Sequence, residues 1–251
     1  MTSATSGIVD FHSHHVPPHW TLTTLANFAP SQRARWERIN RRLADPGALL
    51  EAIESGDIAA RIVNIPTALF SHPGETLAAD VFQRVNDQIA ELVASHPQHL
   101  HGIATVDAFS GETGALQLTR AVRDLKLRGV FLESEKNGSL LDAPEARPIL
   151  QAAADLGVAV FAHPVNPQGL TQQMARYGQV GTLFARGTTN AASLIALLEG
   201  GVFEAAGASG RVHQPRDRRT VAGSRFCPPR RRRAIGRRAA APACLYRYDG
   251  I

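Results

Sequence analysis

From Gly7 to about Phe203, short apolar runs alternate with longer stretches in which apolar residues recur at helical spacing. The short runs are rich in β-branched and aromatic residues, which favour buried extended backbone. They predict strands at residues 8–12, 60–65, 101–106, 128–132 and 157–162. The longer stretches predict helices at residues 46–55, 76–95, 111–125, 144–156 and 190–199. This alternation indicates βα units around a parallel sheet.

Five successive βα units predict an α/β fold of the (β/α)8 TIM-barrel type, because polar residues with possible catalytic roles follow the strand ends. After Phe203 the sequence becomes rich in Gly, Ala, Pro and Arg, and no apolar periodicity continues the pattern. We therefore expect a barrel that is incomplete after its fifth or sixth βα unit. The expected domains are a barrel at residues 1–203 and an aberrant or disordered tail at residues 204–251.

The formal net charge of +5 is unevenly distributed. Residues 204–251 contain twelve Arg, no Lys and three acidic residues, whereas the preceding residues contain 15 basic and 19 acidic ones. Arginine runs neutralise phosphates, so nucleic-acid binding through the tail is one alternative function. The tail has few aromatic residues and matches no binding module, so we do not expect nucleic acid as a partner.

The composition favours a cytoplasmic protein. Residues 1–7 are polar and uncharged, without the basic flank and apolar stretch of a signal peptide. No apolar run approaches the roughly 20 residues that span a bilayer, so no membrane partner is expected. Cys227 and Cys244 are too few for a disulfide framework. The sequence leaves a homodimer open.

Histidines follow two of the predicted strands. His12 and His14 are separated by one residue at the end of the first strand, and residues two apart in extended chain point to the same side. His163 follows the fifth strand. Neutral imidazoles are common zinc ligands, and a catalytic site keeps one position open. A His-rich surface loop and a structural histidine are the alternatives, but the two motifs together favour a shared metal site.

Several segments carry a family resemblance across residues 7–204. They include Val9-Asp-Phe-His-Ser-His14, Gly129-Val-Phe-Leu132, Phe161-Ala-His-Pro164 and Gly200-Gly-Val-Phe-Glu204. In this order they resemble the amidohydrolase-related family that includes aminocarboxymuconate-semialdehyde decarboxylase and several aromatic-acid decarboxylases. The resemblance implies a TIM barrel and a divalent metal, usually Zn²⁺. It further implies that His12, His14 and His163 are three protein ligands.

The family also uses a histidine after the sixth strand and an aspartate after the eighth. His213 and Asp249 do not lie in that context, so we assign neither role to them.

We expect a metal-dependent decarboxylase acting on a small aromatic or unsaturated carboxylic acid. The stretches Asn137-Gly138 and Leu141-Asp142 resemble the decarboxylase branch of the family more closely than the hydrolases. A hydrolase that attacks an amide, lactone or ester with metal-activated water is the alternative. Arg41, in an Arg-rich stretch after the first strand, is the candidate for substrate binding, because guanidinium groups bind carboxylates bidentately. A solvated helix face is the other explanation for that stretch.

The tail suggests a frameshift. Codons permitted for residues 212–219, read one base later, can encode Ser-Thr-Asn-Leu-Gly-Ile-Gly, which resembles the end of the family's sixth strand. An inactive frameshifted remnant is therefore a further alternative to an active enzyme.

Overall fold

The computed structural model describes residues 7–17, 30–71 and 75–203. Five predicted strands are present within this part of the chain, and their ends differ from the predicted ranges by at most two residues. They are β1 (Val9–His14), β2 (Ala60–Asn64), β3 (Leu100–Gly102) continued by β4 (Ala104–Thr105), β5 (Gly129–Glu133) and β8 (Ala159–His163). The prediction of a TIM-barrel type of fold built from parallel βα units is confirmed.

All neighbouring barrel strands are parallel, in the orders β1-β2-β3 and β4-β5-β8. The third strand of the sequence is divided at Ile103, so that β3 pairs with β2 and β4 pairs with β5. The Ile103 amide donates a hydrogen bond to the Val63 carbonyl oxygen at 3.1 Å. The carboxyl ends of all these strands therefore point the same way, which is where barrel enzymes place their active groups.

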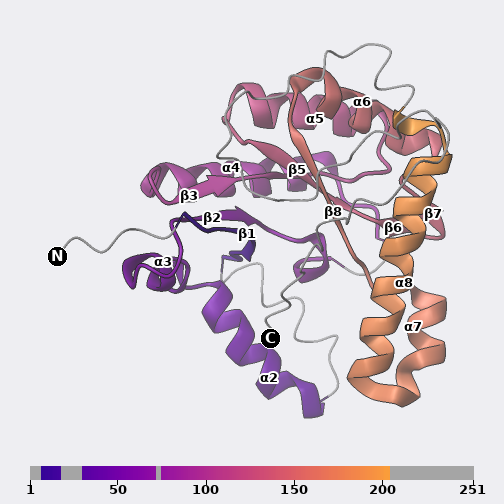
Figure 1. Ribbon diagram of the computed structural model, residues 1–251, viewed down its shortest axis with the longest axis horizontal. Coiled ribbons are helices and arrows are strands. Elements are labelled where there is room, and N and C mark those ends of the chain that lie inside the picture. Colours follow the sequence, from indigo (N-terminus) through magenta and orange to yellow (C-terminus); the bar gives the residue numbers. More distant parts are fainter. Residues whose placement is uncertain (1–6, 18–29, 72–74, 204–251) are drawn as a thin grey trace, which may run out of the picture. The chain divides into compact units, whose positions relative to one another are not determined.

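Seven α-helices lie in the described part of the chain. They are α2 (Pro30–Leu43), α3 (Pro46–Glu54), α4 (Ala79–Ser95), α5 (Glu112–Arg123), α6 (Arg147–Leu156), α7 (Gln168–Met174) and α8 (Gly178–Glu199). Short 3₁₀ turns occupy η1 (Thr67–Leu69), η2 (Pro144–Ala146) and η3 (Ala175–Tyr177). Figure 1 shows α4, α5 and α6 along one side of the strands and α7 beside α8.

A small hairpin follows β5. Its strands β6 (Glu135–Lys136) and β7 (Ser139–Leu140) pair antiparallel. The connecting residues Asn137 and Gly138 both have positive φ, at 53° and 86°. Glycine and asparagine tolerate this conformation best, which explains the Asn-Gly pair at this turn.

Local sequence signals fix several helix ends. The Asp45 carboxylate accepts a hydrogen bond from the Gly47 amide at 2.9 Å, and Pro46 occupies the first turn of α3. Gly157 ends α6 with a φ of 66°. In contrast, α2 was not predicted, and α8 begins at Gly178 instead of Asn190. The stretch from Gly187 to Thr189 has low intrinsic helix propensity, which packing of α8 against α7 overrides.

One buried side chain links α4 to the strands. Asn86 is 2% exposed, and its amide both donates to the Thr105 carbonyl oxygen at 2.9 Å and accepts from the Thr105 amide at 2.8 Å. The Thr105 hydroxyl in turn donates to the Ile65 carbonyl oxygen at 2.9 Å. These bonds hold α4, β4 and the end of β2 in one arrangement.

Within the described residues, no helix has both the length and the apolar character needed to cross a bilayer. The predicted boundary at residue 203, the tail at 204–251 and the frameshift fall on residues outside the described part of the chain.

The Asn86→Ala substitution should lower the free energy of unfolding by roughly 2–4 kcal/mol, because two buried hydrogen bonds are lost together. Urea denaturation followed by circular dichroism would measure the change. Glu91→Ala, on the exposed face of the same helix, is the matched control and should stay within about 0.5 kcal/mol of the parent. Equal losses in the two variants would contradict the role given to Asn86.

Candidate metal centre

Three histidines predicted from the sequence come together in space. His12 and His14 lie on β1, and His163 is the last residue of β8. Each offers one ring nitrogen, and these nitrogens all lie within 4.8 Å of one another. The ring centroid of His163 is 5.3 Å from that of His12 and 5.8 Å from that of His14. This arrangement could hold a metal ion, because three imidazoles converge from two strand ends.

A bulge shapes the β1 side of the centre. Asp10 pairs with Arg61 on β2 and Ser13 with Val63, so β1 has one residue more than β2 over this interval. Such a bulge redirects the side chains of the strand. On this bulged strand, the Nε2 atoms of His12 and His14 lie 3.0 Å apart.

The Asp10 carboxylate stabilises this bulge. It accepts hydrogen bonds from the His12 amide at 3.1 Å and from the Ser13 hydroxyl at 2.8 Å. Arg61 pairs with the same carboxylate at 3.0 Å, and this ion pair is partly buried. The Asp10 carboxylate, which precedes the His-X-His segment, and Arg61 of the neighbouring strand thus hold the conformation of this segment.

Asn64 orients the ring of His14. The His14 Nδ1 atom lies 2.7 Å from the Asn64 Oδ1 atom. An amide oxygen only accepts hydrogen bonds, so Nδ1 carries the proton and donates it. The Nε2 lone pair of His14 is then free to face the other histidines, as a metal ligand requires.

An aromatic layer lies beneath the histidines. Phe131, which is 1% exposed, stacks on Phe161, with their ring centroids 5.9 Å apart. The Phe131 centroid is also 4.6 Å from that of His163, and the Phe161 centroid is 5.1 Å from that of His12. This layer removes water from one side of the centre.

Burial keeps the three imidazoles neutral. It is the main reason that the pKa of His14 falls to about 4 and the pKa of His163 to about 2, and the neighbouring histidines lower both further. Burial also lowers the pKa of His12, while the charge of Asp10 partly opposes that effect. Neutral imidazoles keep the lone pairs that metal coordination uses.

Glu133 ends β5 directly beside His163 in the sheet register. Its buried carboxylate accepts a hydrogen bond from the Thr67 hydroxyl. Burial raises the Glu133 pKa to about 7, and the charge of Asp107 raises it further, while Lys136 opposes the shift. Asp107 itself pairs with Lys136 at 2.7 Å. The sequence alone could not decide between a site role and a strand end for Glu133, and the structure places it next to the histidine centre.

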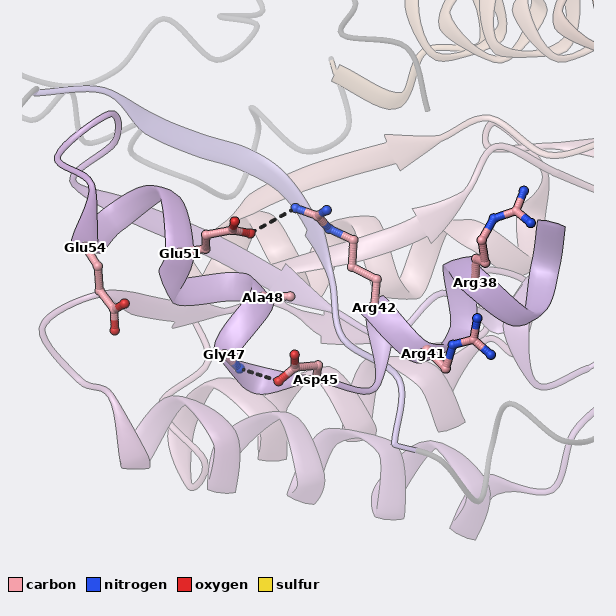
Figure 2. A pocket seen from close by; sticks show the side chains of 8 residues that line it. All are labelled: Arg38, Arg41, Arg42, Asp45, Gly47, Ala48, Glu51 and Glu54. Atoms are coloured by element: carbon pink, nitrogen blue, oxygen red, sulfur yellow. Dashed lines mark hydrogen bonds and ion pairs between the residues drawn. The ribbon is translucent and has the colours of Figure 1, made fainter. Parts of the chain in front are cut away.

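Arg41 lies elsewhere on the surface. It is exposed on α2 and lines a pocket with neighbouring charged residues of α2 and α3, as Figure 2 shows. None of the three histidines lines this pocket. The Arg42–Glu51 ion pair across it, at 3.3 Å, is largely solvated and contributes little to stability. A role of Arg41 in substrate binding stays a prediction.

Arg186 is a charged neighbour of the centre that the sequence did not reveal. It lies on α8, and its Nη2 atom donates to the Pro164 carbonyl oxygen at 3.2 Å. Its positive charge contributes to the lowered pKa of all three histidines. No motif signalled this residue, because the predicted helix began only at Asn190.

Comparison with known proteins places this geometry in a family context. The family model described as Amidohydrolase matches residues 9–222. The 2-amino-3-carboxymuconate-6-semialdehyde decarboxylase of Dictyostelium discoideum is 24% identical over 213 residues, which cover 78% of this chain and 59% of that protein. The chain thus spans about three fifths of the length of this curated relative.

Solved structures of decarboxylases share the fold. A 2,6-dihydroxybenzoate decarboxylase complexed with 2,6-dihydroxybenzoate is 21% identical, with a TM-score of 0.67, over 79% of this chain and 64% of that chain. The 5-carboxyvanillate decarboxylase of Novosphingobium aromaticivorans contains bound manganese and 3-methoxy-4-hydroxy-5-nitrobenzoic acid. It is 21% identical, with a TM-score of 0.68, over 80% of this chain and 63% of that chain.

The Glu133→Gln substitution should change how stability depends on pH when metal is removed with a chelator. A carboxyl group whose pKa is raised on folding contributes its full stability below the pKa of 4.5 that it has in the unfolded chain. This contribution to the free energy of unfolding is lost as the pH rises through the folded pKa of about 7. Glutamine does not ionise, so the free energy of unfolding of the variant should increase relative to that of the parent as the pH rises. The gain should reach at most about 3 kcal/mol by about pH 8.

Urea denaturation across this pH range would measure the difference between the two proteins. The exposed Glu54→Gln variant is the control, and its difference from the parent should stay flat. A flat difference for Glu133→Gln as well would show that Glu133 ionises normally.

Proposed function

The chain belongs to the amidohydrolase family, and from this premise we propose that its three-histidine centre binds a divalent metal ion and serves the decarboxylation of a small aromatic or unsaturated carboxylic acid. The observation that carries the proposal is the convergence of three neutral ring nitrogens from β1 and β8. The decarboxylases that resemble this chain in sequence and in fold support the choice of reaction.

The donor set fits a metal ion. The ring nitrogens of His12, His14 and His163 are close enough to share one ion after small side-chain rotations. Since the Nδ1 proton of His14 is directed at Asn64, its Nε2 atom has a free lone pair that faces His12 Nε2 at 3.0 Å. A neutral His12 ring protonated on Nε2 donates a hydrogen bond to this lone pair, and a metal ion would take the place of that proton.

We propose zinc as the metal. Imidazole nitrogen suits zinc well, and divalent zinc binds nitrogen ligands more tightly than manganese does. Manganese, which is bound in the similar 5-carboxyvanillate decarboxylase, is the alternative. Metal analysis of the purified protein separates the two.

The residues of this chain have defined tasks in the proposed reaction. When bound, the metal ion would supply a Lewis acid that stabilises the negative charge left on the substrate as carbon dioxide departs. The three histidines hold this centre, and Asn64 fixes the ring orientation of His14. Phe131 and Phe161 exclude water on the strand side, which strengthens electrostatic interactions with a bound acid.

Decarboxylation is preferred to hydrolysis because the similar proteins named above are decarboxylases. We retain a cytoplasmic location and a homodimer as proposals.

Replacement of any one of His12, His14 and His163 by alanine should abolish stoichiometric binding of a divalent ion, because the two remaining imidazoles bind too weakly. Metal content after dialysis, measured by mass spectrometry, tests this expectation. His99→Ala removes an exposed histidine and is the matched control, which should retain the metal of the parent.

The same proteins test the reaction. The metal-loaded parent and the His99→Ala variant should release carbon dioxide from a hydroxylated benzoate, and the three ligand variants should not. Stoichiometric metal in the His163→Ala variant would contradict the shared centre. Hydrolysis of an ester or lactone by the parent, without release of carbon dioxide, would contradict the proposed decarboxylation and leave the metal centre standing.

The Asn64→Ala substitution should weaken metal binding by about 10- to 100-fold without abolishing it, because the His14 ring loses the partner that fixes its proton and orientation. Competition with a chromogenic chelator measures the dissociation constant. Ser55→Ala, at the exposed end of α3, should leave the metal affinity unchanged. Unchanged affinity in Asn64→Ala would show that the ring of His14 needs no such support.

A further inference from the structure

One side of α8, called here the apolar face of α8, carries large apolar side chains that the described part of the chain leaves exposed. Their exposed fractions range from 42% to 74%. They recur at helical spacing, three near each end of the helix, and so lie on the same side of it. A group of this kind is informative where a single exposed leucine is not. The six residues are Val180, Leu183, Phe184, Leu194, Ile195 and Leu198.

The opposite face of α8 is the buried one, although most of its side chains are small. There α7 packs so closely that a Cβ added at Gly181 would lie 2.1 Å from the Met174 carbonyl oxygen. Figure 1 shows the two helices side by side. Folding of a single chain thus uses the small residues of α8 and leaves the large ones substantially exposed. The buried residues are Gly181, Ala185, Thr189, Ser193 and Leu197.

The apolar face of α8 is uncharged. The charged residues of α8 are Arg186 and Glu199, and neither belongs to it. Arg186 instead donates to the Pro164 carbonyl oxygen, and Glu199 is the last residue of the helix. A charged polymer or an anionic membrane surface gains no attraction from such a face, whereas an apolar protein surface does.

The exposed area is sufficient for a dimer. At their exposed fractions the six side chains present roughly 550 Å² in one copy, at the upper end of the apolar patches that monomers carry. Two copies joined through this face would remove about 1,100 Å² from water before any surrounding residue is counted. A specific interface needs on the order of 1,000 Å² in total.

The apolar face of α8 is complementary to itself. Gly187 and Ala191 lie exposed in its middle, between the large residues of the two ends. Small residues at this point let two helix backbones approach closely. In an antiparallel pair about a two-fold axis at the level of residue 189, the large residues at one end of each helix pack on those at the other end of the second helix. Gly187 of one copy then faces Ala191 of the other.

The segment that follows the described residues fits this face poorly. Residues 204–251 contain twelve arginines and eight residues of Val, Ile, Leu, Phe or Tyr, and no uncharged stretch in them is longer than eight residues. A second α8 has the required length, pattern and lack of charge, because it is uncharged from Gly187 to Leu198. These observations favour a second copy of the chain as the occupant.

We propose that the apolar face of α8 is the surface through which two copies of this chain form a symmetric dimer. The proposal assigns a surface to the homodimer that the sequence left open. It does not depend on the metal centre, because none of its residues belongs to that centre.

The Gly187→Lys substitution tests the crossing point. A Cβ added at Gly187 meets no atom within 4 Å in one chain, and lysine favours a helix more than glycine does, so the variant should fold with the far-UV circular dichroism of the parent. Sedimentation equilibrium should show the parent at twice the 27.0 kDa of one chain. The dimer dissociation constant of Gly187→Lys should be at least about 100-fold larger, because a charge would enter the apolar contact.

A second pair of variants separates the proposed face from exposed apolar residues in general. Ile195→Glu places a carboxylate on the apolar face of α8, where 60% of Ile195 is exposed, and should weaken the dimer by a similar factor. Leu116→Glu is the matched control on α5, where 70% of Leu116 is exposed. Its dimer dissociation constant should stay within about 3-fold of that of the parent.

Mixing two variants tests the antiparallel arrangement. Ala191→Glu alone should weaken the dimer as Gly187→Lys does. In an equimolar mixture, the lysine of one copy would face the glutamate of the other, and the heterodimer should form at least about 10-fold more tightly than either variant with itself. This gain also shows that both variants are folded.

A monomeric parent, an unchanged dissociation constant in Gly187→Lys and Ile195→Glu, or equal weakening by Leu116→Glu would overturn this inference. A mixture of Gly187→Lys and Ala191→Glu that dimerises no more tightly than each variant alone would overturn the pairing of α8 with α8. A monomeric parent that becomes less stable to urea in Gly187→Lys would assign the face to residues 204–251 of the same chain instead.

Discussion

The centre depends on keeping three neighbouring imidazoles uncharged. Protonation of two rings at these separations would place like charges together above an aromatic layer that offers them no water. Burial and mutual repulsion therefore act in the same direction, and both leave ring nitrogens with free lone pairs. The strand pairing, the bulge in β1 and the bond between His14 and Asn64 hold the three rings close to one another.

Much of the scaffold could be predicted from the sequence because its signals are local. β-branched and aromatic runs mark the strands, and helical spacing of apolar residues marks α3, α4, α5 and α6. The three histidines could be brought together because parallel strands present their carboxyl ends at one edge. Here the order of the strands supplies the long-range information that a motif lacks.

Other parts of the site depend on contacts that leave no local pattern. The bulge between Asp10 and Ser13 arises from pairing with β2, so the strand sequence alone does not reveal it. In the sequence, nothing distinguishes Asn64 from an ordinary polar residue at the end of a strand. Arg186 directly precedes the stretch of low helix propensity from Gly187 to Thr189, which becomes helical only through packing, so neither its secondary structure nor its direction could be foreseen.

The bulge in β1 has a consequence for how this segment can vary in length. Its extra residue lies between Asp10 and Ser13, whose partners on β2 are only two residues apart. Deletion of Phe11 would remove the bulge while Asp10, Ser13 and His14 kept their partners on β2, so the strand would lose the irregularity that accompanies the 3.0 Å approach of the His12 and His14 Nε2 atoms. The length of this hexapeptide therefore matters to the geometry of the centre even when both of its histidines are kept.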